Sequence, residues 1–293
     1  MTRESRPILA AVWMLGAAAS FSAMAVAGRE IWAELNTFEL MLYRSLIGFV
    51  IVLGLLGFHR AGFAQIRTQK PRAHIARNLV HFAGQNLWFF GVALIPLSQL
   101  VALEFTNPLW VALLAPLMLS ERMTPARILA AVIGFIGVLI VARPGIEPVT
   151  LGHLAGLGAA IGFALNTIFT KRIMRTDSVL CVLFWMTLAQ AVMGFLMSLP
   201  GGIPVPSTAL LPWIAVVGVC GLTAHFCLTS ALGAAPATIV APMEFIRLPV
   251  IALVGLAVYG EPILLTVFIG AMIILAGNFL NIWAERQNQH HAA

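Results

Sequence analysis

Charged residues are scarce in this chain of 293 residues, because Asp, Glu, Lys and Arg together make up only 10% of it. A soluble domain usually has about a quarter of its residues charged. Hydrophobic residues reach 60% and the mean hydropathy is +0.97, so few side chains are suited to face water. This composition excludes an ordinary soluble domain and predicts an integral membrane protein.

Residues and motifs of enzyme chemistry are also sparse. The sequence has one aspartate, Asp177, and two histidines inside apolar runs, His81 and His225, lie in different runs. Neither HExxH nor GxSxG occurs in the sequence, so we expect no enzyme activity and no cofactor. The sequence has no Walker A motif either, which excludes ATP-driven transport by this chain alone.

Cysteine is rare as well. Cys181, Cys220 and Cys227 all lie within apolar runs, and none of them belongs to a CxxC motif. This pattern supports neither a disulfide framework nor a metal site. We expect the cysteines to act as small apolar filler.

Ten apolar runs of about 20 residues are long enough to cross the hydrocarbon core of a bilayer. In lipid each run must be helical, because a strand would leave its backbone groups unpaired. The first run and its flanks also fit a cleavable signal peptide, but the repeat described below favours its retention. The runs cover residues 8–27, 39–58, 76–95, 97–119, 126–142, 151–171, 179–199, 209–231, 236–259 and 262–283.

The formal charge of +6 could suggest a nucleic-acid partner, but the basic residues form no aromatic-interleaved stripe and lie in short gaps between apolar runs. Alternate gaps collect thirteen Lys and Arg residues, against Arg29 and Arg143 on the other side. The positive-inside rule therefore predicts that both termini are cytoplasmic. We therefore expect the protein to lie in the lipid bilayer and not to bind nucleic acid.

The chain contains an internal repeat. Residues 96–137 match residues 236–277 at a shift of 140 without gaps, and LGAAASF at 15–21 matches LGAAIGF at 157–163. Shared positions include Pro96 with Pro236, Glu104-Phe105 with Glu244-Phe245, Glu121 with Glu261 and Gly137 with Gly277. The sequence thus predicts two units, residues 1–147 and 148–293, with five spans each.

Five is an odd number, so the two units must cross the membrane in opposite senses. We therefore predict an all-α fold of ten transmembrane helices arranged as two inverted five-helix repeats. Inverted repeats are a recurring architecture of transporters, in which the substrate site lies near the bilayer midplane at the repeat interface.

Three stretches resemble a known family: FELMLYRSLIGF at 38–49, NPLWVALLAPLMLSERMTPARILAAVIGFIGVLIVARPG at 107–145, and APMEFIRLPVIALVGLAVYGE at 241–261. They are similar to the drug/metabolite transporter superfamily, and specifically to ten-helix exporters with two EamA-type repeats. The layout also resembles the aromatic amino acid exporters of that superfamily. The resemblance implies a cavity lined by helices 1, 3, 4, 6, 8 and 9, with helices 5 and 10 at the periphery.

Glu104 lies in the middle of an apolar run, where a charge costs roughly 2.5–3.5 kcal/mol on insertion scales. It should therefore face a partner or a wet cavity, and Asn107 one turn later extends the same polar face. Two interpretations remain open. Glu104 either lines the cavity, with a possible role in proton coupling, or is a hydrogen-bonded residue that holds helices together.

Glu244 has Arg247 three residues later, which is close enough for an ion pair within one helix. Such a pair could be purely structural. Alternatively, Arg247 could bind a substrate carboxylate, for which a planar guanidinium is well suited.

The third run places His81, Gln85 and Trp88 on one helix face, which favours a cavity lining over a satisfied core histidine. Asn166 and His225 are weaker cavity candidates, on runs that the family resemblance assigns to the cavity.

Aromatic residues supply further candidates. Trp110 could stack on a planar substrate, and Phe245 belongs to the repeated Glu-Phe pair. Phe21 and the repeat-equivalent Phe163 follow small residues that let helices approach closely, so they could form apolar walls or gates. Ordinary packing would explain these two phenylalanines equally well.

The remaining candidates are structural or gating residues. Arg44 and Glu39 lie about one turn apart, so we expect a structural anchor or an outer-gate ion pair. Pro108 lies inside the fourth run and should kink it. Glu121 and Glu261 close the fourth and ninth helices in the pattern of the resembled family.

Together these features predict a secondary transporter of a bacterial inner membrane that exports amino acids, aromatic and other neutral ones included, by alternating access. Glu104 and Arg247 would anchor the zwitterion. The alternatives are a carrier of another metabolite, such as S-adenosylmethionine, a vitamin, a nucleoside or a cationic drug, or a channel. The expected partner is a small-molecule substrate, and no metal is expected. The sequence is compatible with a monomer.

Overall fold

The computed structural model describes residues 6–58, 60–119, 125–143, 146, 148–234 and 243–291. All regular elements in these residues are helices. They are α1 (Pro7–Ile31), α2 (Thr37–Phe58), α3 (Pro71–Leu94), α4 (Leu97–Glu104), α5 (Asn107–Leu119), α6 (Pro125–Ala142), α7 (Leu151–Ile173), α8 (Val179–Ser198), α9 (Leu211–Ala234), α11 (Arg247–Tyr259) and α12 (Leu265–His291), with short 3-10 helices η1 (Gly62–Ile66) and η2 (Leu199–Gly201).

These helices form ten membrane spans, with α4 and α5 as two halves of the fourth span. Six spans are long and apolar enough on their own to cross a membrane, including the one from Leu97 to Leu114. Helix α3 has 24 residues but is less apolar, because His81, Gln85 and other buried polar side chains occupy it. The predicted all-α membrane fold is confirmed.

The fourth and ninth spans are broken at the same repeat position. Helix α4 ends at Glu104 and α5 begins at Asn107, while a turn at residues 245–246 precedes the start of α11 at Arg247. Pro108 contributes to the first break because it has no N–H to continue the helix ladder. The predicted kink at Pro108 is therefore a complete interruption, which places polar backbone groups in the middle of the membrane.

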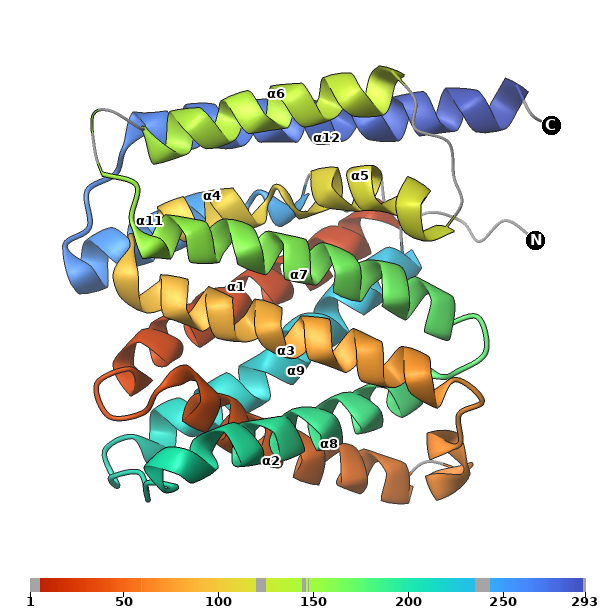
Figure 1. The fold of residues 1–293 in the computed structure, drawn as a ribbon, viewed down its shortest axis with the longest axis vertical. Coiled ribbons are helices and arrows are strands. Elements are labelled where there is room, and N and C mark those ends of the chain that lie inside the picture. The colour runs from red at the N-terminus through yellow and green to blue at the C-terminus, as the bar shows by residue number, and fades with distance from the viewer. Residues whose placement is uncertain are drawn as a thin grey trace.

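The most extensive helix contacts join the two repeats, and the contacts within each repeat are smaller. In two pairs with extensive contacts, α1 with α9 and α3 with α7, the first helix of one repeat contacts the third helix of the other. The pairs α2 with α8 and α6 with α12 join equivalent helices, and α4 with α11 joins the fourth span to the equivalent ninth span. In Figure 1, α1 and α7 run in opposite directions and both termini lie on one side. These contacts form the inverted two-fold arrangement that the repeat predicts.

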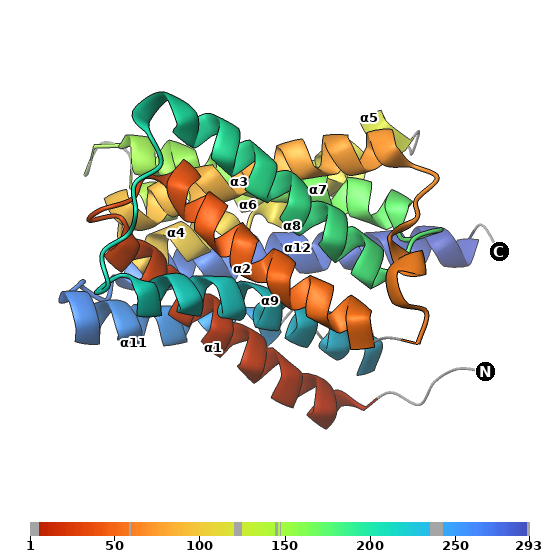
Figure 2. The same cartoon turned by 90° about the horizontal axis from the view of Figure 1, so that it is seen from below.

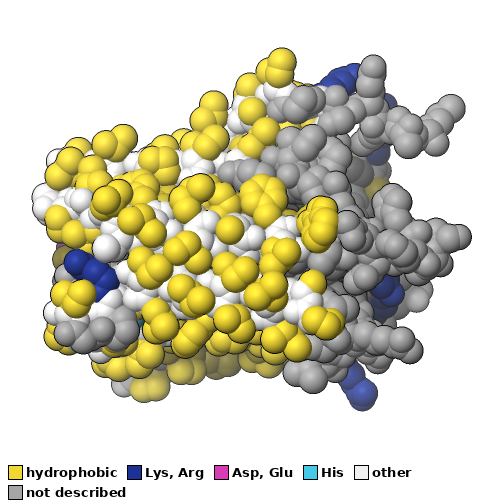
Figure 3. Space-filling view, turned by 90° about the horizontal axis from the view of Figure 1, so that it is seen from above, with side chains coloured by type: hydrophobic (Ala, Val, Ile, Leu, Met, Phe, Trp, Pro, Cys, Tyr) yellow, Lys and Arg dark blue, Asp and Glu magenta, His cyan; other side chains and the backbone are white. Residues whose placement is uncertain are grey.

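The pairs form layers. Helices α6 and α12 lie along one edge of the molecule and α2 and α8 along the opposite edge, with α1, α3, α7 and α9 between them (Figures 1 and 2). Figure 3 shows apolar side chains spread over the face of α6 and α12. Phe135 and Met272 are among the exposed side chains of these helices, as expected for a surface in contact with lipid.

Small residues allow the equivalent helices α6 and α12 to touch. A methyl group added at Gly137 would lie 2.6 Å from the carbonyl oxygen of Gly270. At the two-fold related contact, a methyl group added at Gly277 would lie 2.8 Å from the carbonyl oxygen of Ala130. Both approaches are backbone to backbone, so neither can be relieved by a rotamer change.

We therefore expect Gly137→Ala to destabilise the protein by about 1–3 kcal/mol, because the added methyl group forces α6 away from α12. The thermal unfolding of purified protein in detergent measures this effect. Gly54→Ala in α2 is the matched control, since a methyl group there meets nothing within 4 Å. Equal unfolding temperatures for the two variants would contradict the close packing of this seam.

Candidate functional site

A cavity of about 410 Å³ lies between the two repeats, and residues from α1, α2, α3, α7, α9, α12 and both broken spans line it. Its volume falls in the range of small-molecule sites. The structure places ten of the eleven predicted cavity residues in this wall: His81, Gln85, Trp88, Glu104, Asn107, Phe163, Asn166, His225, Phe245 and Arg247.

The two helix breaks meet in this cavity. Glu104, the last residue of α4, faces Arg247, the first residue of α11, with 2.7 Å between Oε2 and Nη2. The same carboxylate oxygen accepts a 2.8 Å hydrogen bond from Nε1 of Trp88. Glu104 thus links α3, α4 and α11, which combines the two interpretations of this residue: it lines the cavity and it holds helices together.

The predicted ion pair between Glu244 and Arg247 is wrong as a pairing within one helix. The turn at residues 245–246 separates the two residues, so the spacing of a continuous helix does not apply, and Arg247 reaches Glu104 instead. Glu244 lines the cavity and forms no ion pair with the residues that the structure describes. The cavity therefore holds a second carboxylate next to the Glu104–Arg247 pair.

Aromatic rings surround the Arg247 guanidinium. Its Cζ atom lies 5.0 Å from the ring centre of Phe21 and 5.2 Å from that of Phe105, which are cation–π distances. The Phe105 and Phe245 rings, equivalent in the two repeats, lie 4.3 Å apart at an interplanar angle of 35°. These rings give the cavity an apolar, flat-sided region directly beside its charged groups.

A second polar chain begins in the cavity wall at Arg44 of α2 and ends at Gln190 of α8, outside that wall. Arg44 donates a 2.5 Å hydrogen bond to Oε1 of Gln85, whose amide nitrogen lies 3.1 Å from Nε2 of His81. The amide of Gln190 lies 2.8 Å from Nδ1 of His81. Arg44 can only donate, so Gln85 must direct its N–H to His81, and Nε2 of His81 accepts. On the other side of the ring, the contact is between Nε2 of Gln190 and Nδ1 of His81.

Of the two predicted roles for Arg44 and Glu39, the structure shows no ion pair between them, and the role of a structural anchor stays a prediction. Glu39 is the third residue of α2, and its carboxylate accepts the backbone N–H of Asn36 at 2.8 Å while Asn36 accepts the N–H of Glu39 at 3.1 Å. This reciprocal pair is a capping box, which satisfies the free N–H groups at the start of the helix. Arg44 is consequently available to the cavity, which it lines.

The other predicted residues are distributed as follows. His225 lies 6.3 Å from His81 and 5.8 Å from Phe21 between ring centres. Trp110, predicted to stack on a substrate, is absent from the described cavity wall, because its indole N–H points to Thr106 at 3.2 Å. Pro108 lines the cavity, and Glu121 lies outside the described residues.

Helix α12 departs from the expected peripheral position of the tenth helix. It contributes Asn278 and Phe279 to the cavity wall, and Nδ2 of Asn278 donates a 3.2 Å hydrogen bond to the carbonyl of Phe105 at the first helix break. This site residue was missed, although a single asparagine within an otherwise apolar run was a visible signal. The oxygens of Asn278 and of Asn166 are buried without a hydrogen-bond partner in the described part of the chain.

At the end of the molecule opposite the termini, a group that we call the Arg29 network closes the helix ends. Arg29 pairs with Glu261 and donates to the carbonyls of Val92 at 2.7 Å and Ile95 at 2.6 Å. Glu261 also accepts the backbone N–H of Leu97 at 3.0 Å. The network thus ties α1 to the α3–α4 link and to the start of the α11–α12 link.

Comparison with known proteins gives one family. The sequence profile of the EamA-like transporter family matches residues 8–143 and again residues 150–283. The chain is 27% identical over 289 residues to the riboflavin transporter of Rhizobium johnstonii, covering 99% of this chain and 96% of that protein. It is 28% identical over 278 residues to the S-adenosylmethionine uptake transporter of Rickettsia felis, covering 94% and 92%.

A third relative, the riboflavin transporter of Vibrio cholerae, is 27% identical over 296 residues and is matched over 98% of its length. A solved crystal structure superimposes with a TM-score of 0.65 at 18% identity, covering 95% of this chain and 98% of the other. That likeness indicates a shared fold.

The contact between Glu104 and Arg247 can be measured with a double-mutant cycle. We expect Glu104→Gln and Arg247→Gln each to lower the free energy of unfolding by about 1–3 kcal/mol, because each leaves one charge in the cavity wall without its partner. The double variant should lose less than the sum of the two, with a coupling of about 1 kcal/mol. Denaturant unfolding in detergent provides the values. If the losses in unfolding free energy of the two single variants simply added up in the double variant, the pairing would be contradicted. Glu34→Gln, on the exposed surface, is the control.

Proposed function

The chain belongs to the EamA-like transporter family, and from this premise we propose that it is a secondary carrier of a flat heteroaromatic metabolite of the riboflavin kind. As a family member it is a multi-pass membrane transporter and not an enzyme. The proposed location is a bacterial inner membrane with both termini in the cytoplasm, as the distribution of Lys and Arg predicts. Relatives named as riboflavin transporters that align along nearly their whole length support the substrate class.

The observation that carries the proposal is the pair of unpartnered amide oxygens beside the phenylalanine rings. Asn166 and Asn278 line the cavity, and their amide oxygens are buried without a partner in the described part of the chain; leaving such groups unsatisfied costs about 1–3 kcal/mol each. Riboflavin has an imide N–H on its ring and several hydroxyl donors on its chain. Its ring system would lie against Phe105 and Phe245, while the donors satisfy the amides.

S-adenosylmethionine is the second candidate, and the two carboxylates favour it. Glu104 and Glu244 both line the cavity near the phenylalanine rings, which suits a sulfonium cation. Relatives named as uptake transporters for this compound support the same possibility. Glu244→Gln should separate the candidates, because it removes the carboxylate that a cation needs and that riboflavin does not.

Amino acid export, the first expectation from the sequence, fits less well than the alternative of another small metabolite. The relatives carry the names of riboflavin and S-adenosylmethionine transporters. Glu104 and Arg247, the proposed anchors for a zwitterion, also bind each other. An amino acid would have to break this pair to use either group.

We further propose that transport proceeds by alternating access, with the Arg29 network as the closed outer gate. The network joins α1, the α3–α4 link and the α11–α12 link on the side opposite the termini. Opening this side requires that all of these bonds break together. The helix breaks at Glu104 and before Arg247 provide the bending points between the gate and the cavity.

Reconstituted liposomes test the function directly. We expect saturable riboflavin uptake, followed by its fluorescence, and faster exchange when the lumen is preloaded with riboflavin, since carriers show counterflow and channels do not. Asn278→Ala should reduce the rate about tenfold, which corresponds to the loss of one hydrogen bond of about 1.4 kcal/mol.

Trp110→Phe is the matched control, because Trp110 lies outside the described cavity wall and should leave the rate unchanged. Labelled S-adenosylmethionine and a panel of amino acids are run in parallel. Transport of an amino acid alone would overturn the substrate class while leaving a carrier in place, and unsaturable flux of every solute would overturn the carrier itself.

The gate makes a separate prediction. In a background without native cysteines, a cysteine at Met24 in the cavity wall reports access from the outer side through its reaction with an impermeant maleimide. Glu261→Gln weakens the Arg29 network and should raise the labelling rate several-fold. The control is Glu34→Gln, whose carboxylate binds Ser207 on the exposed surface. Equal rates for the two variants would argue against the gate.

A further inference from the structure

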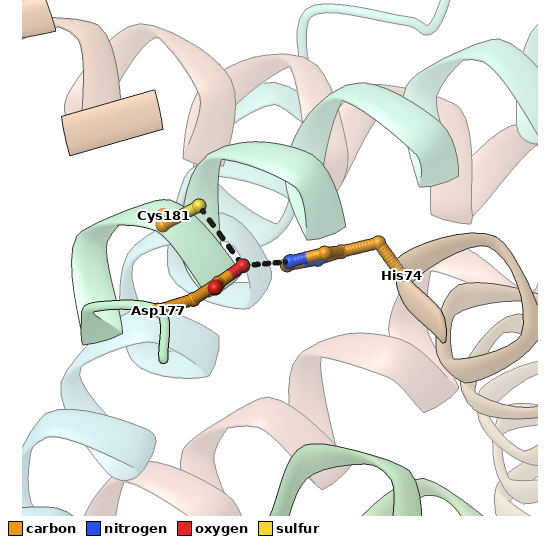
Figure 4. A group of neighbouring side chains, drawn as sticks. All are labelled: His74, Asp177 and Cys181. Atoms are coloured by element: carbon orange, nitrogen blue, oxygen red, sulfur yellow. Dashed lines mark hydrogen bonds and ion pairs between the residues drawn. The ribbon is translucent and has the colours of Figure 1, made fainter. Parts of the chain in front are cut away.

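A second group of chemically active side chains lies away from the cavity. His74 is in the first turn of α3, Asp177 is in the link between α7 and α8, and Cys181 is in the first turn of α8. Figure 4 shows the three side chains pointing toward one another. The group lies on the side of the molecule that carries both termini (Figure 1), and none of its members lines the cavity.

The geometry of the group is compact and dry. Nε2 of His74 lies 2.8 Å from Oδ2 of Asp177, and Sγ of Cys181 lies 3.8 Å from the same oxygen. One potential ligand atom from each residue lies within 4.8 Å of the others. The His74 and Asp177 side chains are 2% and 3% exposed, and Cys181 is fully buried.

The local sequence explains how the chain holds these groups. Ser178 caps α8 by accepting the backbone N–H of Cys181 at 3.2 Å, which fixes the first turn that carries the thiol. Thr176 donates to Oδ1 of Asp177 at 2.7 Å and leaves Oδ2 directed at His74 and Cys181. The three ligand atoms therefore converge because a capped helix start and a fixed turn face the start of α3.

From this convergence we propose that His74, Asp177 and Cys181 form a zinc-binding site. An imidazole nitrogen, a carboxylate oxygen and a thiolate sulfur are the donor types that Zn²⁺ combines in proteins, at about 2.0–2.3 Å from the metal. Harder cations such as Mg²⁺ avoid sulfur, and Cu(I) prefers more than one soft ligand. A water molecule would complete the four positions of a tetrahedral site.

The charge state of Asp177 suits this role. Burial acts to raise its pKa, but hydrogen bonds with Thr68, His74 and Thr176 outweigh burial and lower the pKa to about 2. The carboxylate is therefore ionised at neutral pH and needs no proton loss before it binds a metal. Zinc would displace the Nε2 proton of His74, which faces the Asp177 carboxylate, and the thiol proton of Cys181.

The affinity should be moderate. Three protein ligands are fewer than the four of a typical structural zinc site, and Nδ1 of His74 has no hydrogen-bond acceptor in the described part of the chain. Loss of such an outer partner weakens metal binding by about 10–100-fold. We therefore expect micromolar affinity, as for a site that responds to zinc excess.

The site would join the start of α3, a helix that lines the cavity, to the start of α8, a helix that contacts the cavity residue His81 through Gln190. His74 precedes His81 by two turns on α3, and Cys181 lies on the same helix as Gln190, which is hydrogen-bonded to His81. A metal at the start of both helices would fix their separation. The proposal does not depend on the substrate of the carrier.

Metal titration of the purified full-length protein tests the site. After treatment with a chelator, the protein is titrated with ZnCl₂ and its zinc content is measured by elemental mass spectrometry. We expect one zinc ion per chain above any background, and at least tenfold weaker binding in Cys181→Ser and His74→Gln. The matched control is Cys220→Ser, which removes a cysteine on another helix and should bind zinc as the wild type does.

Cobalt gives a second, independent readout. Co²⁺ bound to a thiolate absorbs in the near ultraviolet, so the wild type and Cys220→Ser should show this band and Cys181→Ser should not. Cys181→Ser keeps the pair of His74 and Asp177, and an unchanged melting temperature without metal shows that the variant is folded. The two consecutive histidines near the C-terminus, His290 and His291, are present in every variant, so any metal that they bind is the same in all of them. Equal zinc content in the wild type and Cys181→Ser, or a cobalt band that survives in Cys181→Ser, would overturn the proposal.

Discussion

The contact between Glu104 and Arg247 is the constraint around which this fold is arranged. A carboxylate and a guanidinium cannot both stay in the middle of a bilayer unless they meet, and here they meet because two helices stop where these residues lie. The broken helices release backbone groups, and one of these, the carbonyl of Phe105, is satisfied by Asn278. The cavity is the space that these interruptions leave between the repeats.

The pairing of helices explains why the cavity lies at the centre. Each repeat contributes helices to contacts with the other repeat, so neither repeat encloses a core of its own. Small residues hold the edges together, with Gly137 against Gly270 and Gly277 against Ala130. Near the centre, by contrast, α4 and α11 are joined by the side chains of Glu104 and Arg247.

Much of this architecture follows from the sequence, because hydropathy and an odd-numbered repeat fix the spans and their opposite senses. The cavity residues on α3 were also predictable, since His81, Gln85 and Trp88 share one face of an unbroken helix. The partners were less predictable. A spacing of three residues assigned Arg247 to Glu244, but this rule assumes a continuous helix, and the turn at 245–246 removes that continuity.

Other differences have equally local causes. Arg44 and Glu39 are close in sequence, yet Glu39 lies at the helix position where a carboxylate caps the backbone of Asn36. Asn278 was missed because the tenth helix was expected at the periphery, and only three-dimensional packing reveals that its face reaches the first helix break. Sequence spacing describes neighbours on one helix, whereas these contacts join different helices.

The repeat is symmetric in backbone but not in charge, and this has an energetic consequence. At a shift of 140, Glu244 corresponds to Glu104, but Arg247 corresponds to the uncharged Asn107. If the repeats exchanged shapes, Glu244 would face an amide where Glu104 now faces a cation. The two states, related by the two-fold axis between the repeats, would then differ in free energy, whereas those of a perfectly duplicated chain would not.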